Sequence, residues 1–384
     1  MKSNGAPPLL RIEKGGTPCY NQYRYTALSY KRRLTMKLLK KAGKIVLIAL
    51  AAILLLVIAA YLLLLGSGGT YYNEDGSYAH VDANCSFHYI INHPGLAGIG
   101  EEVLPLGNPL LRTVCGPWKL KIMIPFLGRH EETVVNGLNY AIDAAEAGMS
   151  EFISYYDAAA KAADPAKEDT GLLYYRTAEN APFALVAPGG GFTMLGVASS
   201  AYPYAKPLQE AGYNVFVLEY RVGLYDGEEN SIPASDRAAE DICAAIEYIV
   251  QNANALGVSA EKYIVVGSSA GGQVTARYCA EFAGRNTSVP APAACIMLYP
   301  ANCQRYDYTN CTVPMYITVC EDDPKIDVAG LDSAVSAMEV AGMTVSYNKF
   351  ETGGHSFGIG IGTPAEGWME RSLAFAASYI EGTH

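Results

Sequence analysis

The stretch Tyr263-Ile264-Val265-Val266-Gly267-Ser268-Ser269-Ala270-Gly271 runs four apolar residues directly into a Gly-x-Ser-x-Gly sequence. The apolar run predicts a buried strand, and the small residues around Ser269 predict a sharp turn into a helix. Side chains two positions before and after the serine would collide in such a turn, which explains the glycine at both places. The pattern therefore predicts an exposed Ser269 hydroxyl at a strand end, beside a helix N-terminus that favours negative charge.

A glycine-rich loop upstream supports this interpretation, because Gly-x-Ser-x-Gly alone can arise by chance in a chain with 38 glycines. A buried strand predicted at 183–186 leads into Pro188-Gly189-Gly190-Gly191-Phe192. Glycines leave backbone N–H groups uncovered, so we predict that Gly190 and Gly191 form an oxyanion hole with the N–H of Ala270. A phosphate-binding loop is disfavoured, since the lysine and the serine or threonine of that motif are missing.

Two later segments add an acid and a base to Ser269. A strand predicted at 315–319 precedes a pair of aspartates, and His355 follows Asp323 by 32 residues, directly after two glycines. The order serine, acid, histidine is one of the chain orders in which catalytic triads occur. In that role Ser269 would attack an acyl carbon, His355 would accept its proton, and an aspartate would hold the imidazole.

Two neighbouring carboxylates compete for the role of the acid. Asp323 is followed by Pro324 and then by the apolar Ile326, a common setting for the acid of such a triad, so it is the preferred candidate. Asp322 is the alternative. The carboxylate that does not serve as the acid is expected to be a solvated loop residue or a helix cap.

Residues 45–65 form an uninterrupted run of 21 residues without a charge, polar only at the hydroxyl of Tyr61. About 20 apolar residues span a bilayer core as a helix, so the run predicts a transmembrane segment. Residues 1–44 hold 11 of the 28 basic residues and one acid, which leaves the remainder with a charge of −20. The positive-inside rule then predicts a cytoplasmic tail at 1–44, a signal anchor at 45–65 and an extracytoplasmic remainder of a single-pass cell-membrane protein.

A cleaved signal peptide is the alternative to an anchor. It is disfavoured because the apolar run is long and Gly66-Ser67-Gly68-Gly69 is a poor cleavage site. The acidic remainder argues against nucleic acid as a partner. Eight of the nine cysteines follow the apolar run, where an oxidising exterior would permit disulfides. Cys303 and Cys311 are the nearest candidate pair, whereas Cys243, Cys279 and Cys295 are expected to be buried thiols.

From about residue 171 the sequence alternates short apolar strands with helical patterns. Strands are predicted at 172–176, 183–186, 215–220, 263–266, 294–299, 315–319 and 345–350, and helices at 235–253, 331–341 and 366–380. Strand and helix alternation with continuous apolar strands predicts an α/β fold, a mostly parallel sheet covered on both faces. We place this catalytic domain at 166–384.

Residues 66–165 have a different composition and are predicted to form a linker and a helical extension, helical from about 131 to 163. The extension could be a lid over the site or a subdomain packed on the sheet edge, and the second is preferred. A cluster of potential metal ligands lies within it: His80, Asp82, Cys85, His88 and His93. Their spacing matches no known site geometry, so we predict no metal.

At this point the residues resemble the α/β-hydrolase superfamily, in particular the acetyl-esterase/lipase group often labelled xylanase-associated esterases. The likeness lies in four stretches: Pro182–Phe192, Ala211–Arg221, the segment around Ser269, and Gly354–Gly358. Residues 362–368 and 164–172 also look like one subgroup of bacterial, often clostridial, hydrolases. The resemblance covers roughly 130–384 and implies the fold and the triad; it says little about the substrate.

The sequence departs from that pattern in several places. Related lipases have histidine before the glycine triplet, whereas this sequence has Pro188, as the acetyl-esterase branch does. Cys320 stands in the acid loop at a position where glycine is common. Tyr220 and Arg221 are expected to support the oxyanion loop. Phe192 and Trp368 are candidates for lining the acyl pocket, with ordinary packing as the alternative.

The resulting hypothesis is a membrane-anchored, outward-facing serine esterase. It would cleave short acetyl-type esters, including those of acetylated polysaccharide, through an acyl-enzyme on Ser269, without a metal or organic cofactor. A serine peptidase or an acyltransferase on the same triad is the alternative. A non-catalytic binding protein is less favoured, because such proteins typically lose the serine or the histidine.

Overall fold

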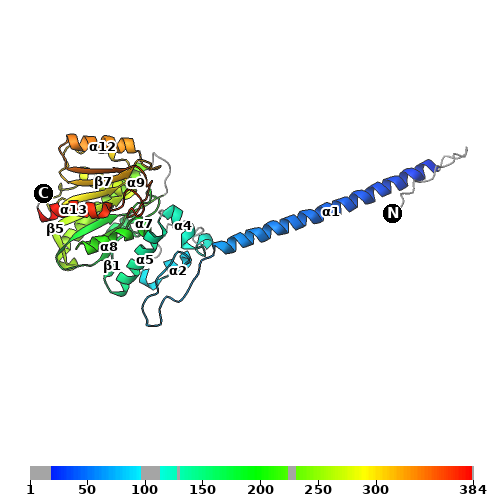
Figure 1. The fold of residues 1–384 in the computed structure, drawn as a ribbon, viewed down its shortest axis with the longest axis horizontal. Coiled ribbons are helices and arrows are strands. Elements are labelled where there is room, and N and C mark those ends of the chain that lie inside the picture. The colour runs from blue at the N-terminus through cyan, green and yellow to red at the C-terminus, as the bar shows by residue number, and fades with distance from the viewer. Residues whose placement is uncertain (1–18, 97–112, 128–129, 224–230, 383–384) are drawn as a thin grey trace. The chain divides into compact units, whose positions relative to one another are not determined.

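A computed structural model describes residues 19–96, 113–127, 130–223 and 231–382 (Figure 1). The chain divides into two compact units, Met1–Leu63 and Leu64–His384. The first holds helix α1 (Cys19–Leu64), whose side chains are exposed from Leu28 through Leu62. The apolar stretch Leu28–Leu64 is long enough to cross a membrane, and it is the one such helix among the described residues.

The second unit is built on an eight-stranded sheet with the order β1-β2-β4-β3-β5-β6-β7-β8. Its strands are β1 (Ser150–Ile153), β2 (Gly171–Tyr175), β3 (Ala181–Ala187), β4 (Asn214–Glu219), β5 (Val258–Ser268), β6 (Ala294–Leu298), β7 (Met315–Cys320) and β8 (Val345–Phe350). Six strands that follow one another in the sheet, β4, β3, β5, β6, β7 and β8, are parallel. Strand β2 runs antiparallel to both of its neighbours, β1 and β4. The mostly parallel sheet predicted from the sequence is confirmed.

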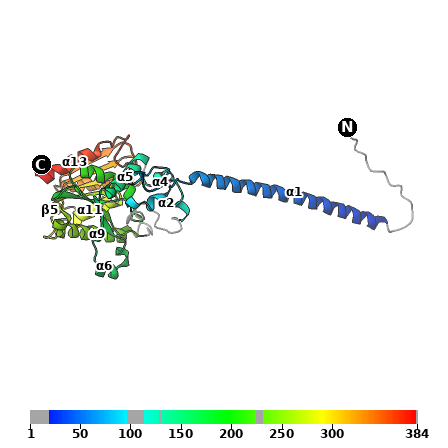
Figure 2. The same ribbon diagram turned by 90° about the horizontal axis from the view of Figure 1, so that it is seen from below.

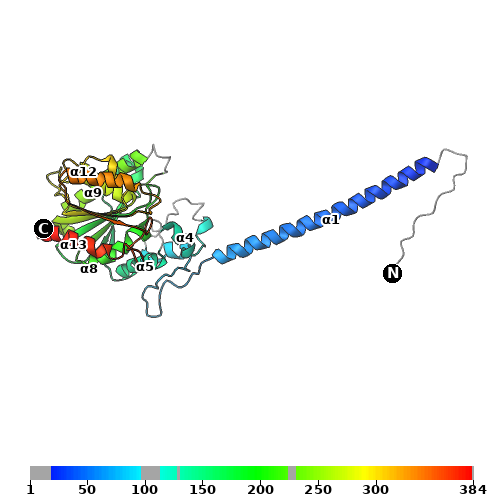
Figure 3. The same cartoon turned by 45° about the horizontal axis from the view of Figure 1, so that its top comes forward.

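Helices cover both faces of this sheet (Figure 3). One layer contains α9 (Ser231–Gln251), α11 (Ala270–Glu281) and α12 (Val328–Val340), and the opposite layer contains α8 (Tyr202–Glu210) and α13 (Trp368–Glu381). The middle strands β3, β4, β5, β6 and β7 are buried almost throughout, because both of their faces pack against helices. Figure 2 shows α9 and α11 together on one side of the sheet and α13 on the other.

The extension before β2 is part of the same compact unit rather than a separate one. Helix α5 (Glu131–Glu146) packs on α8, and β1 adds a strand to the edge of the sheet. Its other short elements are α2 (Phe87–Ile91), η1 (Pro94–Leu96), α4 (Leu120–Leu127), α6 (Ala158–Ala163) and η2 (Pro165–Lys167). The helical region predicted from about 131 to 163 is helical at its two ends, in α5 and α6, but not between them, where the chain turns at Gly148 (φ +66°) and enters β1.

Between β3 and α8 the chain forms the short helix α7 (Val197–Ser200), and α10 (Ala253–Leu256) precedes β5. The 3-10 turn η4 (Cys303–Arg305) follows β6. Buried side chains join the sheet and both helical layers into one apolar core, which includes Trp368, Tyr204, Phe216 and Phe183. This packing fixes the carboxyl ends of the strands that carry the predicted site. The glycine loop follows β3, Ser269 follows β5, Asp323 follows β7 and His355 follows β8.

Candidate active site

Ser269 stands at the turn between β5 and α11, in a backbone conformation that non-glycine residues rarely adopt. Its φ is +53° and its ψ is −116°, and it is the residue directly before the first turn of α11. The Gln273 N–H donates to the Ser269 carbonyl, and the Ser269 N–H donates to Leu298 on the neighbouring strand. Strain of this kind persists only where the surrounding structure enforces it.

The two glycines that flank Ser269 enforce the turn by their lack of side chains. A Cβ on Gly267 would lie 2.4 Å from the Gly271 carbonyl oxygen, and one on Gly271 would lie 2.0 Å from the carbonyl oxygen of Ala187. Backbone atoms cannot move away as a flexible side chain could. The sequence argument for glycine at both positions is thus borne out by the contacts of the turn.

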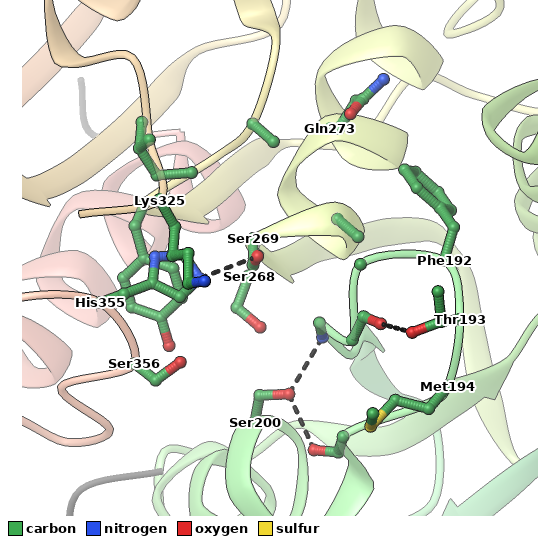
Figure 4. A pocket seen from close by; sticks show the side chains of 18 of the residues that line it. Phe192, Thr193, Met194, Ser200, Ser268, Ser269, Gln273, Lys325, His355 and Ser356 are labelled. Atoms are coloured by element: carbon green, nitrogen blue, oxygen red, sulfur yellow. Dashed lines mark hydrogen bonds between the residues drawn. The ribbon is translucent and has the colours of Figure 1, made fainter. Parts of the chain in front are cut away.

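A chain of two hydrogen bonds links Ser269 to an acid through His355, and Figure 4 shows the first of them, between Ser269 and His355. Nε2 of His355 lies 3.0 Å from the Ser269 Oγ, and Nδ1 lies 2.8 Å from Oδ2 of Asp323. The Asp323 side chain is fully buried, while the imidazole keeps 17 % of its surface exposed. These distances suit proton transfer between a hydroxyl and an imidazole that is held in one orientation.

Asp323 is held as a carboxylate by its surroundings. Burial alone would raise its pKa, but the hydrogen bond and the charge of His355 outweigh burial and hold the pKa below its ordinary value. The N–H groups of Lys325 and Ile326 also donate to its Oδ1. An ionised Asp323 favours the tautomer of His355 that carries its proton on Nδ1 and accepts a proton from Ser269 on Nε2.

Asp322, the alternative acid, has a different contact. Its Oδ1 accepts a hydrogen bond of 2.6 Å from the N–H of Gly354, the residue directly before His355. The two neighbouring carboxylates therefore hold the histidine loop at two points, Asp323 at the imidazole and Asp322 at the backbone. Asp322 is an exposed loop carboxylate, as expected of the residue that does not bond the imidazole, and its bond to Gly354 is a contact that the sequence did not indicate.

The loop after β3 surrounds Ser269 with backbone groups. Gly190 and Gly191 have φ values of +142° and +62°, and a Cβ on Gly190 would lie 1.9 Å from the Met194 carbonyl oxygen. The N–H of Gly189 donates to Oγ of Ser200 over 3.0 Å, as Figure 4 shows. Among the described residues, no hydrogen bond uses the N–H of Gly190, Gly191 or Ala270. These three groups are thus available to an oxygen atom of a substrate.

Tyr220 and Arg221 follow β4 and were both expected to support that loop, but only Tyr220 contacts it, because the bonds of the Arg221 side chain go to Asp241, Glu240, Asp164 and the Arg237 carbonyl. The Tyr220 hydroxyl donates to the carbonyl of Pro188 over 2.7 Å, and the Phe192 ring packs edge-on against Tyr220. Burial would lower the pKa of Arg221, but its carboxylate partners raise it overall, with Asp241 the strongest of them. Arg221 also contacts Asp164, 2.6 Å away, and thereby ties the extension to the sheet.

A cavity of 680 Å³ opens above Ser269, and its lining includes Phe192, Met194, Tyr299, Arg305 and Lys325. Tyr299 follows β6 and packs its ring 4.7 Å from the imidazole of His355. No sequence pattern pointed to Tyr299 or to Ser200, because neither stands in a motif of its own. Phe192 lines the cavity as predicted.

Trp368 does not line this cavity. It is fully buried at the start of α13, where its Nε1 donates to the carbonyl of Gly358 over 2.9 Å. The prediction that Trp368 contributes to an acyl pocket is wrong, and the packing alternative holds. The bond from Trp368 holds the chain at Gly358, three residues after His355.

Potential metal ligands of the extension have other partners. His80 pairs with Asp143 at 2.7 Å, and the fully buried His93 bonds to the carbonyl of Ala79. Within the described part of the chain, no group of three or more histidine, cysteine or acidic side chains gathers around a common point. Cys303 and Cys311 are both buried free thiols, and the sulfur pair in direct contact is Cys279 and Cys295, at 3.0 Å.

The sheet order, the sharp serine turn and the Ser269–His355–Asp323 hydrogen bonds at the carboxyl edge of the strands define an α/β-hydrolase fold. Residues 185–312 match the family model described as alpha/beta hydrolase fold. This match spans the loop after β3 and the serine turn, while His355 and Asp323 lie beyond it.

Three known proteins are similar to parts of the chain. Ethyl acetate hydrolase of Pseudomonas putida is 28% identical over 145 residues, which are 37% of this chain and 39% of that protein. Endo-1,4-beta-xylanase B of Butyrivibrio fibrisolvens is 31% identical over 98 residues, which are 26% of this chain and 15% of that protein. A thermophilic esterase from the Planctomycetes species Thermogutta terrifontis is 19% identical, with a TM-score of 0.49 over 61% of this chain and 92% of that one. The chain thus spans less than two fifths of either curated relative.

Proposed function

We propose that this protein is a serine carboxylester hydrolase that cleaves short, acetyl-type esters. The observation that carries the proposal is the pair of hydrogen bonds that joins Ser269, His355 and Asp323 at the floor of an open cavity. The similarity to an ethyl acetate hydrolase supports an ester substrate, and the similarity to an endo-1,4-beta-xylanase supports a polysaccharide as the molecule that carries the ester.

In this mechanism His355 accepts the Ser269 proton on Nε2 while the serine oxygen attacks the acyl carbon. The carbonyl oxygen of the ester becomes negative and accepts hydrogen bonds from the N–H groups of Gly190, Gly191 and Ala270. His355 then returns the proton to the leaving alcohol, and an acyl-enzyme remains. Water, activated by the same imidazole, releases the acid. Asp323 stabilises the cationic imidazole in both steps.

Hydrolysis of p-nitrophenyl acetate, butyrate and octanoate by the full chain in detergent tests the proposal. We expect kcat/KM to be highest for acetate, and phenylmethylsulfonyl fluoride to abolish turnover by adding one sulfonyl group to Ser269. Mass spectrometry of the labelled peptide identifies the modified residue. A folded protein that neither reacts with this reagent nor hydrolyses any of the three esters would contradict the proposal and favour a binding role.

We further propose that the apolar part of α1 is an uncleaved anchor and that residues 66–384 face away from the cytoplasm. Support comes from the uninterrupted apolar run at 45–65 and from the excess of basic residues before it. An outward site suits a substrate too large to enter a cell, such as a polysaccharide. The polar N-terminal segment would then remain in the cytoplasm.

A C-terminal fusion distinguishes this orientation from its reverse. Alkaline phosphatase fused after His384 is expected to be active, because that enzyme folds in an oxidising exterior, whereas a green fluorescent protein fused there is expected to stay dark. The membrane fraction should retain the fusion after a carbonate wash, at the mass of the uncleaved chain. Release of a shorter product would indicate a cleaved signal peptide instead.

A further inference from the structure

The active-site cavity contains two basic side chains that the proposed mechanism does not use. Arg305 and Lys325 both line this cavity, and both are exposed. No acidic side chain of the described residues joins them in the lining. The part of the chain after residue 44 nevertheless has a net charge of −20. Two cations without a carboxylate therefore distinguish the cavity from the rest of that part.

Neither cation is neutralised by a neighbouring side chain. Among the described residues, the guanidinium of Arg305 and the ammonium of Lys325 take part in no hydrogen bond, ion pair or ring contact. The two acids nearest to Lys325 along the chain bond elsewhere, Asp323 to the imidazole of the triad and Asp327 to the first turn of α12. Both positive charges are therefore available to a ligand in the cavity.

The order of the strands places both cations on one side of Ser269. The glycine loop follows β3, Ser269 follows β5, Arg305 follows β6 and Lys325 follows β7, and these four strands are neighbours in that order. The glycine loop and the two cations thus lie on opposite sides of the serine turn. His355 follows β8, so it comes from the same side as the cations.

This arrangement places the two portions of an ester on different sides of the cavity. In the proposed mechanism the carbonyl oxygen lies at the glycine loop, whereas the leaving oxygen receives its proton from Nε2 of His355. The alcohol portion therefore begins on the side of the cavity that holds Arg305 and Lys325. An acetyl group has no charge of its own, so a charged group that meets these cations belongs to the alcohol.

We propose that the site selects acetyl esters whose alcohol portion carries a carboxylate, and that Arg305 and Lys325 bind this carboxylate. The inference rests on the proposed function and narrows its substrate class. A guanidinium presents paired N–H donors that match the two oxygens of a carboxylate, and an ammonium adds a second positive charge. A cavity lined by charges of one sign also concentrates their field and attracts anions. In a polysaccharide, a uronic acid unit supplies this chemistry.

Two matched esters test the proposal with the full chain in an uncharged detergent. The charged ester is 4-acetoxyphenylacetate, ionised at about pH 7, and the neutral one is 4-acetoxyphenylacetamide. A methylene group separates the charge from the phenol oxygen, so the two leaving groups have similar reactivity. At low ionic strength we expect kcat/KM to be about tenfold higher for the charged ester. About 0.5 M NaCl should remove most of this preference, because both cations are exposed to solvent.

Replacement of either cation should weaken the preference for the charged ester. Arg305→Met and Lys325→Met each remove one charge and should each lower the ratio of kcat/KM for the two esters about threefold, whereas Lys325→Arg should preserve the ratio. The change should appear mainly in KM for the charged ester, because the cations contact a part of the substrate that does not react. Lys262→Met is the matched control. Lys262 is an exposed lysine of β5, about 20 Å along the strand from Ser269, and its replacement should leave the ratio unchanged.

The possible results separate this inference from the function on which it rests. Equal kcat/KM for the two esters in the parent protein would overturn the inference alone, and so would a ratio that neither Arg305→Met nor Lys325→Met lowers. A fall of the same size in Lys262→Met would also overturn it, because the effect would then come from the charge of the whole molecule. A folded protein that hydrolyses neither ester would overturn the proposed function, and this inference with it.

Discussion

Replacement of Ser269 by alanine is expected to lower kcat/KM for p-nitrophenyl acetate by about 10⁵- to 10⁶-fold, the effect of removing a triad serine. The cause is the loss of the oxygen atom that attacks the ester and forms the acyl-enzyme in the proposed mechanism. Alanine fills less space than serine and fits the same φ of +53°, so the fold should tolerate the change. Initial rates at substrate concentrations below KM measure the effect directly.

A matched serine variant provides the control for that result. Ser333 is exposed on α12, where its Oγ bonds to the carbonyl of Ala329, and Ser333→Ala should leave kcat/KM unchanged. Circular dichroism of both variants should match that of the parent protein. If Ser269→Ala retained more than about a hundredth of the activity, the nucleophile would have to be another group, and the proposed mechanism would be excluded.

Asp323→Asn is expected to lower kcat by about 10⁴-fold with little change in KM. The asparagine amide can present an N–H to Nδ1 of His355, which fixes the tautomer that cannot accept the Ser269 proton. The change also removes the negative charge that stabilises a cationic imidazole. Steady-state kinetics with p-nitrophenyl acetate measure both parameters, and the fully buried side chain should occupy the same space in either form.

Asp322→Asn is the companion variant, since it changes the neighbouring carboxylate in the same way. An amide oxygen at 322 can still accept the Gly354 N–H, so we expect kcat to fall by no more than about tenfold. If instead Asp322→Asn lost about 10⁴-fold and Asp323→Asn did not, the roles of the two aspartates would be reversed. Similar losses in both variants would indicate that the histidine loop had moved.

The inner parallel strands β3 to β7 could be predicted closely because the buried part of each is mostly apolar. All seven predicted strands occur, and β8 has its predicted bounds of Val345 and Phe350. β5 begins at Val258, five residues before its predicted start, because its first half contains the polar stretch Ser259–Lys262 at a less buried end of the strand. Apolar periodicity identifies the buried part of a strand and misses the part near solvent.

The edge strand β1 could not be predicted for a different reason. Its sequence, Ser150-Glu151-Phe152-Ile153, is short and half exposed, and alanine-rich helical sequence surrounds it. It becomes a strand because β2 offers an unpaired edge, which is a tertiary contact and not a local preference.

At the site, the residues of motifs could be located from sequence, and so could one of their supports, Tyr220, whereas the other supports could not. Ser269, His355 and the glycine loop stand in recognisable patterns. The bonds that the Gly189 N–H donates to Ser200 and that the Gly354 N–H donates to Asp322 depend on the folded chain. Each support contacts backbone, and backbone contacts leave little trace in a sequence.

The contact between Gly271 and the Ala187 carbonyl limits how the specificity of this protein can be altered. The serine turn and the glycine loop touch backbone to backbone, so neither can be displaced to enlarge the cavity without moving the other. Other side chains that line the cavity, such as Met194, Arg305 and Lys325, have no such restriction. We therefore expect changes in substrate range, natural or engineered, to occur at those residues, while the positions of Ser269 and the glycine loop stay the same.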